Sequence, residues 1–252
     1  MMSTILKFIT VMVLGTFFCT SFASEKNVDE IISQCLPDRA QPAQESELTI
    51  EVMRKKDGSI LQKYQRWVLD NQLHLMPEKN NDPGYIRTAN TESSSIVRRI
   101  YDKGKKSSVR KIESYPESSH HWLLSEDFAL LSTRSDYQFN ISSKNSFGGI
   151  SYINLVARSK SADAPFPKIM LALKESPEDG CALIRSTLFS DETLPRKKIF
   201  YKWKYVDGNR VLKSLHIDDA KTLDNIKYHI ENIRIVKSFE PDVFVFEWKT
   251  NN

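Results

Sequence analysis

The sequence lacks the short motifs that mark common catalytic and metal sites. It contains no glycine-rich phosphate loop, no nucleophile-elbow serine and no Cys-x-x-Cys pair. Its histidines are scattered, and the adjacent His120 and His121 would point to opposite faces of a strand. Asp218 and Asp219 have no third residue at a suitable position that would complete an acid–base set. These absences predict a protein with no catalytic residue, no metal site and no cofactor.

Long apolar runs and a strong excess of one charge are also absent after the first 23 residues. No later segment approaches the ~20 apolar residues that a membrane-spanning helix needs, so we expect no such segment in the mature chain. The net charge is +4, and Lys7 near the N-terminus contributes one of these charges. So mild an excess predicts no nucleic-acid partner, although it is compatible with contact to an anionic membrane surface.

The N-terminus has the pattern of a secretory signal peptide. Lys7 precedes an uncharged, mostly apolar run from Phe8 to Phe18, and Ser21-Phe22-Ala23 fits a small-x-small cleavage site. A lipid-modified cysteine normally follows a small residue, whereas Cys19 follows the large Phe18. We therefore expect an exported protein and not a lipoprotein, with residues 1–23 removed.

The length of residues 24–252 suits one large β-rich domain or two small ones, and we expect the single domain. These residues retain two cysteines, Cys35 and Cys181. In an oxidising compartment an even number of cysteines suggests a disulfide. This bond would close a loop of about 150 residues and stabilise the fold by ~5 kcal/mol in the chain-entropy model. Two buried free thiols are the alternative, because the sequence places neither residue in space.

Helical periodicity is clear only at the start of the mature chain. Apolar residues at 28, 31, 32, 35 and 36 predict a helix over residues 28–36, with Asn27 as N-cap and Pro37 as its end. Eleven or twelve candidate strands follow, joined mostly by short turns such as Asp57-Gly58. Turns that short predict antiparallel neighbours. Residues 132–166 are the least regular, and we expect a functional loop, a lid or a concealed helix there.

The segment Arg196–Val211, RKKIFYKWKYVDGNRV, concentrates aromatic residues on one side of a predicted strand. Ile199, Tyr201, Trp203 and Tyr205 alternate with its other residues and so share a face. Tyrosine and tryptophan often lie where one end of the side chain is apolar and the other is wet. A curved antiparallel sheet with this face inward can leave an apolar trough; ordinary core packing is the alternative.

The C-terminal third carries motifs in a recognisable order. They are Ala182–Arg185, the loop Leu194–Lys198, the basic strand and turn Lys202–Gly208, Leu215–Asp219 and Asp242–Phe244. In this order, and in its overall layout, the chain resembles the outer membrane lipoprotein-sorting proteins, which have the LolA-like fold. The resemblance implies an α+β protein with a strongly curved antiparallel sheet, an open half-barrel of about 11 strands. It also implies a few short helices covering the concave face, an apolar cavity for acyl chains and no catalytic residues.

The resemblance and the aromatic face together predict a non-catalytic periplasmic carrier. It would hold lipid or lipoprotein acyl chains, in outer membrane lipoprotein sorting or envelope lipid transport, with an envelope membrane transporter as a further partner. Apolar burial at ~25 cal/mol per Å² would drive the binding. The lining residues that we expect are Trp67, Leu69, Trp122, Leu124, Tyr201, Trp203 and Tyr205. The alternative is a periplasmic protein-interaction or sensor domain of an envelope complex, with a filled core.

Overall fold

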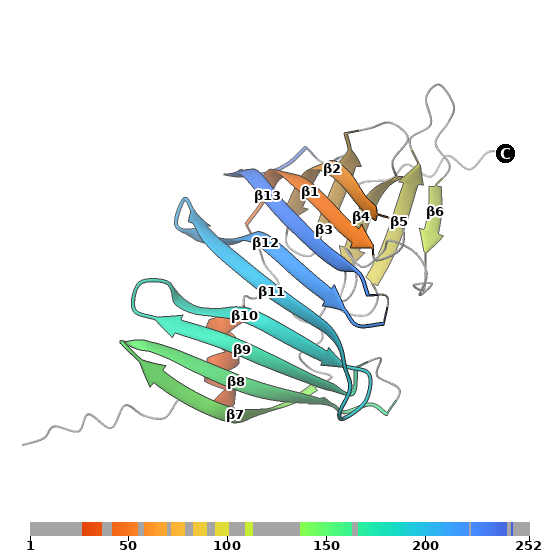
Figure 1. Cartoon of the computed structure of the whole chain (residues 1–252). Coiled ribbons are helices and arrows are strands. Elements are labelled where there is room, and N and C mark those ends of the chain that lie inside the picture. Colours follow the sequence, from red (N-terminus) through yellow and green to blue (C-terminus); the bar gives the residue numbers. More distant parts are fainter. Residues whose placement is uncertain are drawn as a thin grey trace, which may run out of the picture.

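One antiparallel sheet of 13 strands and one short helix make up the described part of the chain (Figure 1). The structure is a computed structural model that describes residues 27–36, 42–54, 58–69, 72–78, 83–89, 94–100, 109–112, 137–162, 166–221, 223–240 and 243. The predicted signal peptide, residues 1–23, lies outside the described residues.

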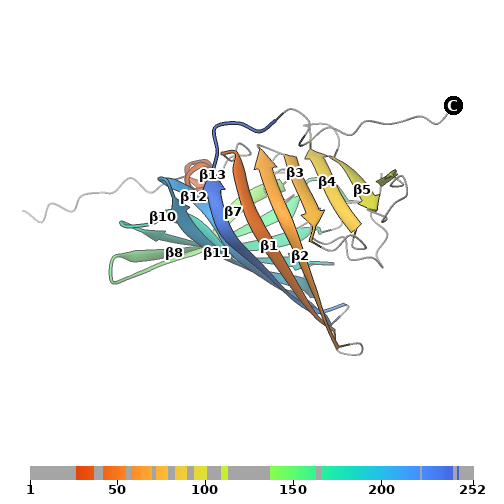
Figure 2. The same cartoon turned by 90° about the horizontal axis from the view of Figure 1, so that it is seen from above.

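The helix α1 spans Val28–Cys35. The strands are β1 (Gln44–Arg54), β2 (Gly58–Leu69), β3 (Gln72–Pro77), β4 (Pro83–Ala89), β5 (Ser94–Ile100), β6 (Val109–Ile112), β7 (Tyr137–Phe147), β8 (Ile150–Ser159), β9 (Lys168–Ser176), β10 (Gly180–Phe189), β11 (Pro195–Val206), β12 (Asn209–Asp219) and β13 (Asn225–Ile235). Their order in the sheet is β6-β5-β4-β3-β2-β1-β13-β12-β11-β10-β9-β8-β7. The sheet is therefore open, with β6 and β7 at its ends, and Figures 1 and 2 show that it is strongly curved.

Helix α1 forms where the apolar spacing predicts it. The side-chain oxygen of Asn27 accepts a hydrogen bond from the Glu30 amide at 2.8 Å, which satisfies one of the free amides at the helix start. The apolar side of the helix buries Ile31, Ile32 and Cys35. This side contacts β10 and β7, so α1 lies on the inner side of the curve (Figure 1).

The predicted fold class is confirmed, with more strands and, among the described residues, fewer helices than expected. The prediction of a loop, lid or helix over residues 132–166 is wrong, because that range contains the β7–β8 hairpin. Strand β7 is an edge strand, so one of its sides has no sheet neighbour within the described part of the chain, and its sequence is mostly polar. This hides the alternation on which strand prediction depends. Of the predicted last strand, residues 243–246, only Val243 is described, and it lies in a turn.

Strand register determines which side chains share the inner face. Directly opposed residues lie on the same side of a sheet. Leu48 of β1 is opposite both Ile230 of β13 and Tyr64 of β2. Ile199 of β11 is opposite both Ser186 of β10 and Ile217 of β12. Chains of such pairs run from β8 to β3 and join the buried apolar residues in one core cluster.

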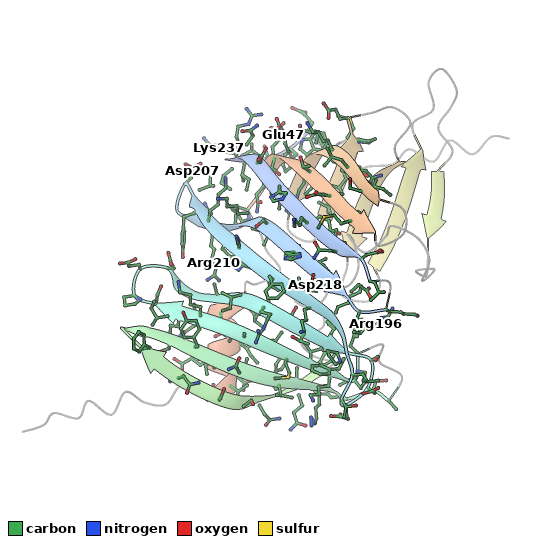
Figure 3. The ribbon with its side chains drawn as sticks, viewed as in Figure 1. Glu47, Arg196, Asp207, Arg210, Asp218 and Lys237 are labelled. Atoms are coloured by element: carbon green, nitrogen blue, oxygen red, sulfur yellow. A yellow bond between two sulfur atoms is a disulfide. The ribbon has the colours of Figure 1, made fainter. Side chains whose placement is uncertain are left out.

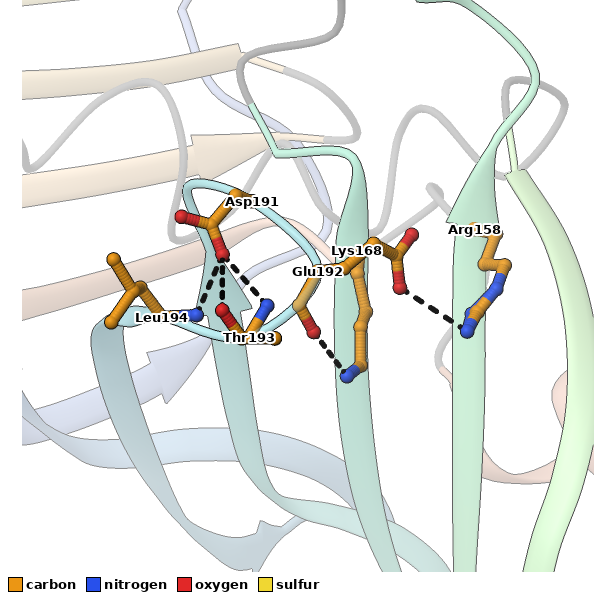
Figure 4. Close-up of polar contacts among 6 residues, drawn as sticks. All are labelled: Arg158, Lys168, Asp191, Glu192, Thr193 and Leu194. Carbon is orange, nitrogen blue, oxygen red and sulfur yellow. Dashed lines mark hydrogen bonds and ion pairs between the residues drawn. The ribbon is translucent and has the colours of Figure 1, made fainter.

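A short loop between β10 and β11 fixes the start of β11 (Figure 4). The Asp191 carboxylate accepts hydrogen bonds from the amides of Leu194 at 2.8 Å and Thr193 at 2.7 Å, and from the Thr193 hydroxyl at 3.0 Å. These bonds, that from Leu194 first, lower the pKa of Asp191. Lys168 Nζ also donates to the Glu192 carbonyl at 2.7 Å. The loop is thus tied both to itself and to β9.

Candidate functional site

The inner face of the sheet is the candidate site, because it is continuous and largely apolar. Its central rows are built by opposed leucine, isoleucine, valine and tyrosine side chains of successive strands. The buried members include Leu48, Ile50, Val52, Tyr64, Val68, Leu73, Leu75, Ile153, Leu155, Leu171, Leu173, Leu183, Ile199, Tyr201, Leu215, Ile217, Ile226, Tyr228 and Ile230. All are 8% exposed or less, so this face is closely packed in the present conformation.

A disulfide holds α1 against this face. Of the two alternatives that the sequence left open for Cys35 and Cys181, the structure has the bond, across a sequence separation of 146 residues. Cys181 belongs to β10, and its neighbour two residues on, Leu183, is buried on the inner face. The bond therefore attaches the first helix to the start of β10, the fourth strand from the β7 edge of the sheet.

Two of the predicted lining residues, Tyr201 and Trp203, stack on each other on the inner side of β11. Their ring centroids are 6.3 Å apart and the ring planes differ by 8°. Tyr201 is 6% exposed and its hydroxyl shares a hydrogen bond of 2.9 Å with the Ser186 hydroxyl. Trp203 is half-buried and packs against the core cluster.

The polar ends of these aromatic residues close a gap in the sheet, which we call the β10–β11 split. Paired residues of β10 and β11 run only from Phe189 and Pro195 to Arg185 and Phe200. Beyond this point, carbonyl groups of β10 and of the turn before it accept hydrogen bonds from side chains. Trp203 Nε1 donates to the Leu183 carbonyl at 2.6 Å, and the hydroxyl of Tyr205, which is 51% exposed, donates to the Asp179 carbonyl at 2.7 Å.

Arg210 of β12 completes the β10–β11 split. Its guanidinium donates to the Cys181 carbonyl and lies over the Trp203 ring, 5.7 Å from the centroid. The Arg210 side chain is labelled in Figure 3. Burial is the main cause that lowers the pKa of this group. Side chains thus bind the carbonyl groups of Cys181 and Leu183, which lie beyond the paired part of β10, and that of Asp179 in the turn before it.

The structure corrects the choice of face for Trp67 and Leu69. In the β1–β2 hairpin Leu48 is opposite Tyr64, so the even-numbered residues of this part of β2 point inward. Trp67 and Leu69 are half-buried on the outer face, where the Trp67 ring lies 5.0 Å from that of His74. They do not share a lining with Tyr201 and Trp203. The predicted lining residues Trp122 and Leu124 lie outside the described residues.

Sequence analysis missed a buried polar group at one end of the inner face. Arg66 is 3% exposed, and its guanidinium donates to the Ser46 hydroxyl at 3.1 Å. Burial lowers the pKa of Arg66 to about 10. Gln44 is also buried in this region. The hairpin register was the available signal, because it places Arg66 in phase with Tyr64 and Leu48.

A hollow lies among the described residues of β1, β2 and β13, but its lining does not resemble an acyl-chain site. This hollow of about 350 Å³ is lined by Glu45, Glu47, Gln65 and the β13 residues Asn232, Ile233 and Arg234. Its carboxylates and amides make it polar, unlike the cavity that the sequence predicted.

Among the described residues, no group of three or more His, Cys, Asp or Glu side chains is arranged to hold a metal ion. No helix in this part of the chain is long and apolar enough to cross a membrane.

Comparisons with solved structures identify the fold. A DUF1329 family protein from Desulfovibrio piger superposes with a TM-score of 0.63 and 11% identity, over 86% of this chain and 92% of that protein. A Vibrio parahaemolyticus domain named for outer membrane lipoprotein sorting superposes with a TM-score of 0.62 and 12% identity, over 82% of this chain and 91% of that domain. A LolA superfamily protein from Nitrosomonas europaea superposes with a TM-score of 0.57 and 10% identity, over 82% of this chain and 91% of that protein. No protein-family model and no curated protein matches the sequence. The chain therefore has a LolA-like fold, as the sequence motifs predicted.

Proposed function

We propose that this protein is a non-catalytic periplasmic carrier that holds lipid or lipoprotein acyl chains against the inner face of its sheet. The observation that carries the proposal is the continuous apolar inner face within a LolA-like sheet. A structural neighbour named for outer membrane lipoprotein sorting supports the same class of cargo. Export follows from the signal-peptide pattern of residues 1–23, and an envelope membrane transporter is the partner that we expect for loading or release.

An acyl chain would bind by replacing contacts that the inner face now makes within the protein. Burial of apolar surface favours the bound state by ~25 cal/mol per Å², so a long chain needs few polar contacts. We propose Tyr201 and Trp203 as lining residues, with Tyr205 at the rim and Trp122 and Leu124 as further members. Release into water is unfavourable for the same reason, so the carrier would hand its cargo to another apolar surface.

A substitution that fills the inner face tests this proposal. Ile50 is buried on that face, whereas Leu61 of the neighbouring strand is 58% exposed. Ile50→Trp should occupy space that an acyl chain needs, and Leu61→Trp adds the same ring outside it. The measurement is saturable binding of a dye that fluoresces in apolar sites, followed by its displacement with a fatty acid.

Fatty-acid affinity should fall at least tenfold in the Ile50→Trp protein and stay within twofold of wild type in the Leu61→Trp protein. Overpacking costs ~1–3 kcal/mol, so both proteins are first checked for a cooperative thermal transition. Equal fatty-acid binding by the two folded variants would place the ligand elsewhere and refute the inner-face site.

The second candidate function is a periplasmic interaction or sensor domain of an envelope complex. The close packing of the inner face favours it, because side chains there are already buried without a ligand. Such a protein binds neither the dye nor fatty acids saturably. The wild-type arm of the same assay therefore separates the two functions.

A further inference from the structure

A buried arginine stands out on the otherwise apolar inner face. Arg66 lies opposite Ser46 of β1 and Leu75 of β3, and its neighbours on the same side of β2 are Tyr64 and Val68. All five residues are buried, and Leu75 has no exposed surface. The guanidinium therefore sits in the face that the proposed cargo would contact.

Arg66 has no countercharge among the described residues. Its one polar contact there is the Ser46 hydroxyl at 3.1 Å, and no carboxylate of these residues lies within ion-pair distance. The nearby acidic residues of β1, Glu45 and Glu47, alternate with the buried Ser46 and so belong to the outer face. Glu45 is instead paired with Arg234 at 2.9 Å.

A single hydroxyl satisfies little of a guanidinium, which carries five N–H donors. Burying a charge without a partner is costly, and an apolar side chain of similar volume would fit this apolar setting with less cost. Natural sequences break such a local rule mainly at functional sites. The partner that Arg66 lacks is therefore an anion. Because Arg66 lies on the apolar inner face, this anion would belong to an apolar ligand.

We propose that Arg66 binds the anionic head group, a carboxylate or phosphate, of an acyl lipid whose chain lies along the inner face. This inference rests on the proposed carrier function. The planar guanidinium can pair with two oxygens of either group at once, a geometry that an ammonium does not match. The Ser46 hydroxyl beside it is a further donor to the same head group.

Matched ligands and variants test the head-group site. Laurate, dodecyl phosphate and dodecanol share a chain length but differ in head-group charge, and inorganic phosphate supplies the anion without a chain. Binding is measured by calorimetry for wild type, Arg66→Met, Arg66→Lys and the control Arg185→Met. Arg185 is exposed on β10, so its replacement removes the same charge from a solvated position.

Wild type should bind laurate or dodecyl phosphate roughly 10–100-fold more tightly than dodecanol, the range expected for a charge-assisted hydrogen bond. The Arg66→Met protein should lose this preference while still binding dodecanol, and Arg66→Lys should keep part of it. Arg185→Met should behave as wild type. Retained dodecanol binding shows that the variant is folded and that only head-group recognition has changed.

Four results would overturn the inference. Wild type that binds the three dodecyl ligands equally has no head-group site, although the carrier function stands. A preference that survives in the Arg66→Met protein assigns recognition to another residue. Inorganic phosphate that binds at Arg66 as tightly as dodecyl phosphate makes this a site for a free anion. If wild type binds no dodecyl ligand, the carrier function fails and the head-group site fails with it.

Discussion

At the residue scale, Arg66 destabilises the folded protein, although the proposed head-group site requires it. Its neighbours Leu75 and Val68 offer no hydrogen bond, and Ser46 offers one. Buried charges that lose or lack a partner destabilise proteins, and apolar replacements of buried charges have stabilised them by ~1–4 kcal/mol. The arginine is thus a residue that the fold tolerates and does not need.

We predict that Arg66→Met raises the free energy of unfolding at pH 8 by ~1–4 kcal/mol. Burial lowers the pKa of Arg66 to about 10 in the folded protein, below its value in the unfolded chain, so unfolding takes up a proton above pH ~10. Wild-type stability therefore gains a contribution as pH rises through this window, and the advantage of the variant shrinks. Urea unfolding of both proteins at pH 8 and pH 11 measures the difference. A less stable Arg66→Met protein at pH 8 would show that the arginine is structural.

At the element scale, the β10–β11 split is the place where the sheet depends on side chains. Trp203 and Arg210 donate to β10 carbonyl groups that lie beyond the part of β10 paired with β11, and Tyr205 donates to the Asp179 carbonyl just before β10. The aromatic residues of β11 therefore stabilise the sheet, in addition to any role in lining a binding site. Their rings pack inward at Tyr201 and Trp203, and their polar ends reach β10.

We predict that Trp203→Phe lowers the free energy of unfolding by about 1 kcal/mol more than Trp67→Phe does. The first change removes the hydrogen bond to the Leu183 carbonyl, whereas Trp67 packs beside His74 on the outer face. Amide hydrogen exchange should also accelerate in β10 residues 180–184 of the Trp203 variant. Equal losses in the two variants, with unchanged exchange, would mean that the indole bond adds nothing to the split.

Elements with strong local signals were predictable from the sequence, and elements set by distant neighbours were not. Helix α1 has its N-cap, apolar spacing and end within one short segment, and it formed where expected. Strand β7 was not predicted, because an edge strand has one sheet neighbour and keeps polar residues that hide the alternation of a strand. The face of Trp67 was assigned wrongly because β2 has apolar residues on both sides, so only its register with β1 separates them. Arg66 was missed for the same reason.

At the scale of the whole molecule, the Cys35–Cys181 bond connects the N-terminal helix to β10, the fourth strand from the β7 edge of the sheet. It closes a loop of 146 residues, for which the chain-entropy model gives ~5 kcal/mol of stabilisation. The bond also restricts motion, because α1 stays beside β10 while the bond is intact. If the inner face takes up an acyl chain, the contacts that give way lie elsewhere, and α1 acts as a fixed wall.

We predict that the double variant Cys35→Ser/Cys181→Ser unfolds with a free energy lower by ~2–5 kcal/mol, yet binds fatty acid within threefold of wild type below its thermal midpoint. Loss of the bond removes a constraint on the unfolded chain, while the wall formed by Ile31 and Ile32 remains packed on the sheet. Thermal unfolding and dye displacement, each on oxidised wild type and on the variant, measure the two effects separately. Fatty-acid affinity at least tenfold higher in the variant would contradict this view. It would identify α1 as a lid that the disulfide restrains, since removing the restraint would then lower the cost of opening the inner face.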